Sequence, residues 1–208
     1  MQDIASTIIE TAGHLFLKYG IRSISMDDIA HELSISKKTI YHCFKDKNEI
    51  VCITSKRFLD SQKLKFDNIE KESDNAIQRL YKTTLHAREI FEKMNPSILF
   101  DIKKYYKDAW KLYLDYERNV MYESMIRTLE EGIEEGLFRS DIDVRILATL
   151  RSEEVKLAFD RDIFPDDSFN FQDVQFQLLE HFFYGIVTEE GYALLIKYKK
   201  NIVTNEQI

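Results

Sequence analysis

Residues 25–44, SMDDIAHELSISKKTIYHCF, contain two short helical segments separated by a tight turn. Ser25 precedes two acids, a pattern that begins a helix by capping its first amides, and Ile29, Ala30 and Leu33 give that helix one apolar face. The second segment follows Ser36, which is typical of a helix N-cap, and extends to Phe44. The quoted stretch therefore predicts a helix, a short turn and a second short helix.

The second helix has two chemically different faces. Helical spacing places Ile40 and Phe44 on the core side, with Cys43 beside them. The opposite face carries Lys37, Lys38, Thr39, Tyr41 and His42. Lysines and hydroxyls suit phosphate oxygens, while Lys38 and His42 suit base edges. Helix, turn and short helix is the geometry that inserts a recognition helix into the major groove of double-stranded DNA.

The flanking sequence completes a three-helix domain. An amphipathic helix is expected over residues 3–19, with Gly20 ending it in a left-handed conformation. A fourth helix starts near Asp46–Glu49 and extends to about Glu70; Lys47 and the first amides of that helix offer a further phosphate site. The chain has a net charge of −7, but four lysines face one acid between residues 34 and 48. Such a basic segment on an acidic chain favours contact with nucleic acid at one end.

These residues resemble the N-terminal domain of the tetracycline-repressor (TetR) family. The resemblance covers about residues 4–52 without gaps, and includes Thr11–Phe16, Tyr19-Gly20, Ser25–Ala30 and Ser36–Phe44. It implies a homodimeric repressor of a near-palindromic operator, with a C-terminal domain that senses a small molecule. Carried over by motif position, the DNA contacts are Lys37, Lys38, Thr39, Tyr41, His42 and Lys47. Two positions depart from the family pattern, because Ser34 replaces a turn glycine and Cys43 replaces a tyrosine.

The remaining sequence predicts an all-α protein. We expect a DNA-binding domain at residues 1–48 and a helical regulatory and dimerisation domain at 49–208. Further helices are expected at about 74–94, 97–106, 108–135, 143–163, 171–188 and 189–200. The helices at 143–163 and 171–188 are apolar on more than one side, which predicts burial at the centre of the domain or against a second subunit. The resemblance favours a four-helix bundle between subunits.

The middle of the chain is rich in aromatic residues. Phe100, Trp110 and Tyr113 are candidates for the walls of a ligand cavity, with His86 as a polar anchor, and an apolar or aromatic inducer is expected. Each of these aromatic side chains can equally fill a core. The alternative is a helix-turn-helix protein without an inducer, whose C-terminal domain dimerises or binds proteins.

Other classes of protein are disfavoured. The sequence has no Gly-rich phosphate loop, nucleophile elbow or cluster of metal ligands, so neither an enzyme nor a cofactor is expected. Cys43 and Cys52 have poor metal-ligand spacing and are expected to be thiols. No apolar run is long enough for a membrane span, and the first residues lack the pattern of a signal peptide. A cytoplasmic protein is therefore expected.

Overall fold

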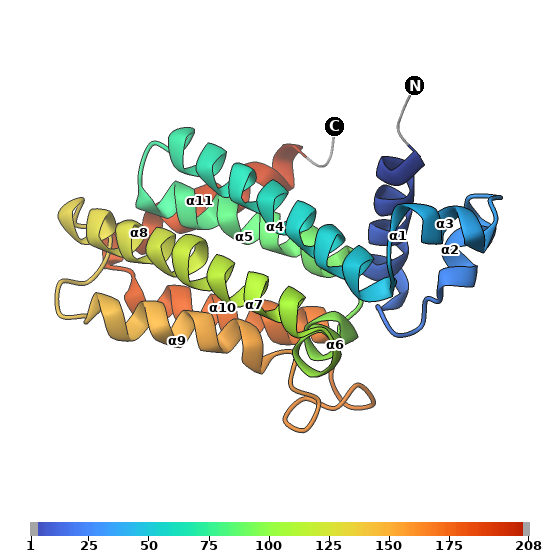
Figure 1. The fold of residues 1–208 in the computed structure, drawn as a ribbon. Helices are drawn as coiled ribbons and strands as arrows, with labels where there is room; N and C mark the ends of the chain where they lie inside the picture. The colour runs from blue at the N-terminus through green and yellow to red at the C-terminus, as the bar shows by residue number, and fades with distance from the viewer. Residues whose placement is uncertain (1–3, 206–208) are drawn as a thin grey trace. The chain divides into compact units, whose positions relative to one another are not determined.

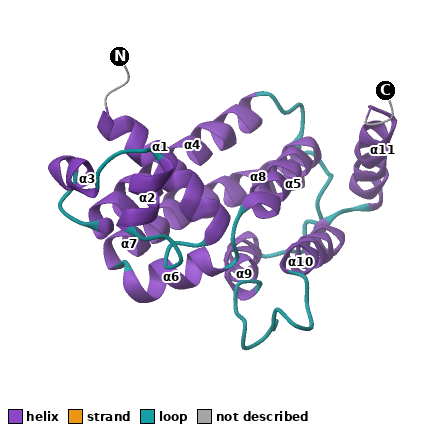
Figure 2. Ribbon diagram, turned by 90° about the vertical axis from the view of Figure 1, so that its right-hand side faces the viewer, coloured by secondary structure: helices purple, strands orange, loops and turns teal. Residues whose placement is uncertain are grey.

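The computed structural model describes residues 4–205 and side chains up to Lys199. In this range the chain is helical, and Figure 2 shows no strand, although Phe138 and Val187 form an isolated antiparallel bridge. The helices, labelled in Figure 1, are α1 (Ile4–Tyr19), α2 (Met26–Glu32), α3 (Lys37–Cys43), α4 (Lys47–Lys71), α5 (Ala76–Lys93), α6 (Ser97–Tyr105), α7 (Lys107–Tyr116), the π-helical segment η1 (Glu117–Tyr122), α8 (Glu123–Glu134), α9 (Val144–Leu157), α10 (Phe171–Ile186) and α11 (Glu189–Asn205). The predicted all-α fold is confirmed.

The first of two compact units contains residues up to Lys63 together with Phe91–Tyr116. Helices α2 and α3 pack on each other and on α1 (Figure 1). Fully buried Ile8, Ile29, Ile40 and Ile50 bring α1 to α4 onto one apolar core, and Ile102 of α6 joins it. Such burial of large aliphatic side chains contributes about 1.5–3 kcal/mol each. It fixes the short helices α2 and α3, which would be unstable alone.

Gly20 ends α1 as predicted. Its φ is 84°, the left-handed conformation that glycine adopts without strain, and its amide donates to the carbonyl of Phe16 at 2.9 Å. The Asn95 amide also donates to the Leu17 carbonyl at 2.7 Å, so the segment before α6 lies against the end of α1.

The second unit contains Leu64–Ile90 and the chain from Glu117 onward. Its core is formed by Leu129 of α8, Ala148 of α9 and Phe182 and Phe183 of α10, together with Phe138. Phe138 lies so close to Gly132 that any side chain at residue 132 would overlap its ring. This core holds α8, α9 and α10 together.

Two predicted helices have different boundaries in the structure. The helix expected at 108–135 is an uninterrupted helical run from Lys107 to Glu134, but residues 117–122 adopt π-helical hydrogen bonding. The helix expected at 143–163 ends at Leu157. Residues 158–164 form successive turns instead, with the amides of Ile163 and Phe164 donating to the carbonyl of Asp160. The predicted start at Asp3 lies outside the described residues.

The compact units are not divided at residue 48. Residues 91–116 return to pack on the N-terminal helices because Ile102 and Ala109 are buried in that core. Helix α4 contributes residues to both units. The functional division into residues 1–48 and 49–208 stays a prediction.

Candidate nucleic-acid interface

The start of α2 is fixed by a reciprocal cap. The amide of Ser25 donates to a carboxylate oxygen of Asp28 at 2.7 Å, and the amide of Asp28 donates to the Ser25 hydroxyl at 3.1 Å. These hydrogen bonds from Ser25 hold the pKa of the Asp28 carboxyl below its ordinary value. The predicted capping box is therefore confirmed, and it sets where the helix-turn-helix begins.

The turn between α2 and α3 depends on Ser34. This residue has a φ of 54°, in the left-handed region, which costs a non-glycine residue about 1 kcal/mol. The conformation lets the amides of Ser34 and Ile35 donate to carbonyls of α2. Ser36 then caps α3 by accepting the Thr39 amide at 3.1 Å, as predicted.

Helix α3 separates a buried face from an exposed one. Ile40 and Phe44 lie in the core, whereas Lys38, Tyr41 and His42 are exposed, with 48% of Tyr41 accessible. The predicted division of the two faces is confirmed. The exposed side chains carry the donors and acceptors that recognition of phosphates and base edges requires.

Two predicted contact residues already have partners within the protein. The ammonium group of Lys37 donates to the carboxylate of Asp27 in α2 at 2.7 Å, a hydrogen bond that raises the pKa of Lys37. The Thr39 hydroxyl lies 2.9 Å from the hydroxyl of Ser36. Sequence analysis missed Asp27 as a partner because its only signal was its position in a capping sequence.

Lys47 differs from the lysines of α3. Its ammonium group donates to the carbonyl of Ile21 in the α1–α2 loop at 2.6 Å, and lies 5.7 Å from the centre of the Phe16 ring. Its side chain is half-buried, and this burial lowers the pKa of Lys47. The structure thus places Lys47 inside the domain rather than on the exposed face with Lys38.

The first amides of α4 are partly occupied. Asp46 accepts the amide of Glu49 at 2.9 Å, and the Glu49 carboxylate accepts the amide of Lys45 at 2.7 Å. The predicted cap of the fourth helix is confirmed. However, its two acids lie where the sequence suggested a phosphate site.

The candidate ligand residues fall in both units. In the first unit, Trp110 stacks on Tyr113 with ring centres 5.2 Å apart, and both pack on the core. Phe100 is 50% exposed and contacts Tyr105 edge-on. In the second unit, the His86 ring lies edge-on to Phe66, and burial lowers the pKa of His86. The structure thus brings Trp110 and Tyr113 together, while Phe100 faces outward on α6.

Helices α9 and α10 expose apolar residues beside a groove of about 330 Å³. Ile146 and Leu150 of α9 are 65% and 46% exposed, and Gly185 of α10 leaves open space where a side chain would lie. Phe182 lines the same groove but is only 3% exposed, because most of it lies in the core. An apolar surface of this kind is typical of a site that packs against another protein.

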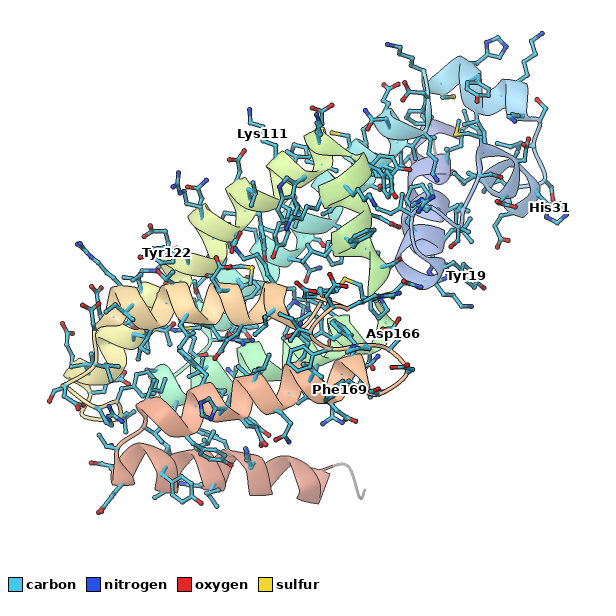
Figure 3. The ribbon with its side chains drawn as sticks, turned by 90° about the horizontal axis from the view of Figure 1, so that it is seen from below. Tyr19, His31, Lys111, Tyr122, Asp166 and Phe169 are labelled. Atoms are coloured by element: carbon cyan, nitrogen blue, oxygen red, sulfur yellow. The ribbon has the colours of Figure 1, made fainter. Side chains whose placement is uncertain are left out.

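Figure 3 shows the side chains of the described residues, with Tyr19 and His31 on the surfaces of α1 and α2. Among these residues no three His, Cys, Asp or Glu side chains form a group that could hold a metal ion. Cys43 and Cys52 are free thiols. None of the described helices combines the length and apolar character needed to cross a membrane.

The capped helix-turn-helix and the exposed polar face of α3 define a DNA-binding transcriptional regulator. Residues 8–51 match the family model described as bacterial regulatory proteins, tetR family. The chain belongs to the TetR family of transcriptional regulators and is not an enzyme.

Similar proteins extend beyond the N-terminal domain. The HTH-type transcriptional repressor KstR2 of Mycobacterium tuberculosis is 26% identical over 147 residues, covering 67% of this chain and 72% of KstR2. The solved structure of KstR2, a ketosteroid transcriptional regulator, has a TM-score of 0.63 at 23% identity, over 91% of this chain and 97% of that one. A transcriptional regulator from Saccharomonospora viridis, solved in complex with choline, has a TM-score of 0.70 at 20% identity over 91% and 100%.

Proposed function

We propose that this protein is a homodimeric repressor that binds a near-palindromic operator and is released from it by a small molecule. The observation that carries the DNA-binding part is the exposed face of α3, on which Lys38, Tyr41 and His42 are accessible opposite buried Ile40. Lys37, Thr39 and Lys47 complete the predicted set, through phosphate contact or by supporting the fold. Contact with chromosomal DNA is consistent with a cytoplasmic location.

The dimer is proposed to form through α9 and α10. Exposed Ile146 and Leu150 provide the apolar surface, and the groove beside them, with its open position at Gly185, can receive side chains of a second copy. Two copies are required because a symmetric operator presents two half-sites about 34 Å apart in successive major grooves. Pairing these helices buries side chains that are otherwise exposed to water.

The inducer is proposed to be an apolar or aromatic molecule with few polar groups. Support comes from the similarity to KstR2, a ketosteroid regulator and transcriptional repressor, and from the choline complex of the S. viridis regulator. Phe100, Trp110 and Tyr113, with His86 as a polar partner, stay our candidate ligand residues. A ligand releases DNA only if it binds the two conformations of the regulator with different affinity.

Selection of bound duplexes from a random DNA pool tests the proposed function. We expect an enriched sequence with twofold symmetry, protected by the purified protein in a footprint. Compounds are then screened for release of that duplex, with the emission of Trp110, the only tryptophan, as a second signal. Failure to enrich any sequence would contradict the proposal. Release with unchanged Trp110 emission would move the ligand site elsewhere, and a screen without any active compound would favour a regulator that has no inducer.

A further inference from the structure

Lys47 begins α4, yet its ammonium group is directed into the domain. It donates to the carbonyl of Ile21 at 2.6 Å and lies 5.7 and 6.0 Å from the ring centres of Phe16 and Tyr106. An ammonium group over two aromatic rings is stabilised by their negative faces. Lys38 and Lys45, in contrast, are exposed. Lys47 thus joins the start of α4 to the α1–α2 loop.

A buried acid of α6 faces the same loop. The Asp101 carboxylate accepts the backbone amide of Arg22 at 3.2 Å, and only 4% of Asp101 is exposed. Asp101 also attracts the ammonium group of Lys47 electrostatically. A buried carboxylate is costly unless positive charge and hydrogen bonds compensate it. Lys47 and the Arg22 amide supply both, so the loop is held between α4 and α6.

The position of this loop determines where the helix-turn-helix begins. Arg22 follows Ile21 directly, and the capping residue Ser25 of α2 is three residues further on. The Arg22 side chain is tied to α6 as well, since its guanidinium lies 4.5 Å from the centre of the Tyr105 ring. A shift of the loop would therefore move the start of α2 relative to α4.

We propose that Lys47 is a positioning residue, with Asp101 as its counter-charge, which holds the α1–α2 loop in the DNA-binding geometry and does not itself neutralise a phosphate. This inference rests on the DNA-binding function proposed above. To reach a phosphate, the ammonium group would have to leave the Ile21 carbonyl and the two rings and remove positive charge from beside Asp101. Lys47 then supports affinity through geometry, whereas Lys38 contributes charge at the surface.

The salt dependence of binding distinguishes these roles. Each phosphate that a lysine neutralises adds about 0.9 to the slope of log Kd against log salt concentration. Lys38→Met, the matched control, should lower the slope by about that amount per protomer. Lys47→Met should weaken binding to the selected duplex at least tenfold with the wild-type slope, and should weaken binding to an unrelated duplex less. Lys47→Arg, which keeps a donor, should restore most of the affinity.

Asp101→Asn provides a second test that does not alter Lys47. It should weaken binding to the selected duplex with an unchanged slope, and its effect should not add to that of Lys47→Met, because both remove the same link. Circular dichroism at the assay temperature establishes that each variant is folded; if Lys47→Met is unfolded, Asp101→Asn and Lys47→Arg decide. A Lys47→Met slope reduced as in Lys38→Met, or wild-type affinity in Lys47→Met or Asp101→Asn, would overturn the proposal. A wild-type protein that binds no selected duplex would instead contradict the proposed function.

Discussion

The ammonium group of Lys37 and the carboxylate of Asp27 lie 2.7 Å apart and join the first turn of α3 to α2. Both side chains are substantially exposed, 46% and 67% respectively, so DNA phosphates can compete for the lysine. An exposed pair of this kind is worth only about 0.2–1 kcal/mol. The free protein therefore holds one predicted contact in a weak internal pair that DNA must displace.

Asp27→Asn should strengthen DNA binding. Releasing Lys37 and removing one negative charge beside the phosphates should lower Kd by about two- to fivefold, the equivalent of a weak exposed pair. Fluorescence anisotropy with selected and unrelated duplexes measures both affinities. Asp60→Asn is the matched control, because Asp60 forms an exposed pair with Lys56 of α4, also at 2.7 Å. Equal effects of the two substitutions would argue against a role for Asp27 in masking Lys37.

His42→Ala and Lys38→Ala should relax sequence preference. If these exposed side chains contact base edges, each loss should reduce discrimination at particular base pairs by about 1–3 kcal/mol. The measurement is binding to a set of duplexes with single base-pair changes in the selected sequence. Lys45→Ala, a change at another exposed lysine, should instead weaken all duplexes similarly. A uniform loss in the His42 and Lys38 variants would assign them to the phosphates.

Leu150→Asp should give a folded monomer. Leu150 is 46% exposed beside the groove, so an aspartate is tolerated in one copy but not in an apolar pairing of α9 and α10. Phe182→Asp is the informative contrast: Phe182 is 3% exposed within the core, and burying a carboxylate there should unfold the second unit. Sedimentation velocity and circular dichroism separate the outcomes. A Leu150→Asp dimer would place the interface elsewhere.

Glu70→Gln should change how stability depends on pH. Arg127 donates to both carboxylate oxygens of Glu70 at 3.0 Å, and these bonds lower the Glu70 pKa from its ordinary value of 4.5. A lowered folded-state pKa means that the carboxylate stabilises the fold above that ordinary value and ceases to do so as pH falls through the lowered one. In urea unfolding, Glu70→Gln should therefore be less stable than wild type near neutral pH, with the difference shrinking below pH 4.5. A constant difference would indicate that the ion pair is not its source.

Local patterns predicted the helix-turn-helix well. The spacing of Ile40 and Phe44, the serines before α2 and α3, and the tolerance of Ser34 for a left-handed turn all depend on neighbours within four residues. The sequence therefore contained enough information to predict which side of α3 is exposed.

Side chains that depend on distant partners were harder to predict. Lys47 turns inward because of a carbonyl at Ile21 and a carboxylate at Asp101, neither of which is close in sequence. Phe182 was predicted at the subunit interface, but the core of its own unit buries most of it. Periodicity identifies an apolar helix face without indicating whether its own chain or a second copy covers it.

Binding to operators of altered spacing tests the central claim most directly. In a dimer with one α3 in each of two successive major grooves, five base pairs inserted between the half-sites rotate one of them about half a turn away. We predict that the selected duplex binds two protomers and that the insertion lowers affinity to the level of an unrelated duplex. Equal affinity for both duplexes would contradict recognition of paired half-sites by a dimer.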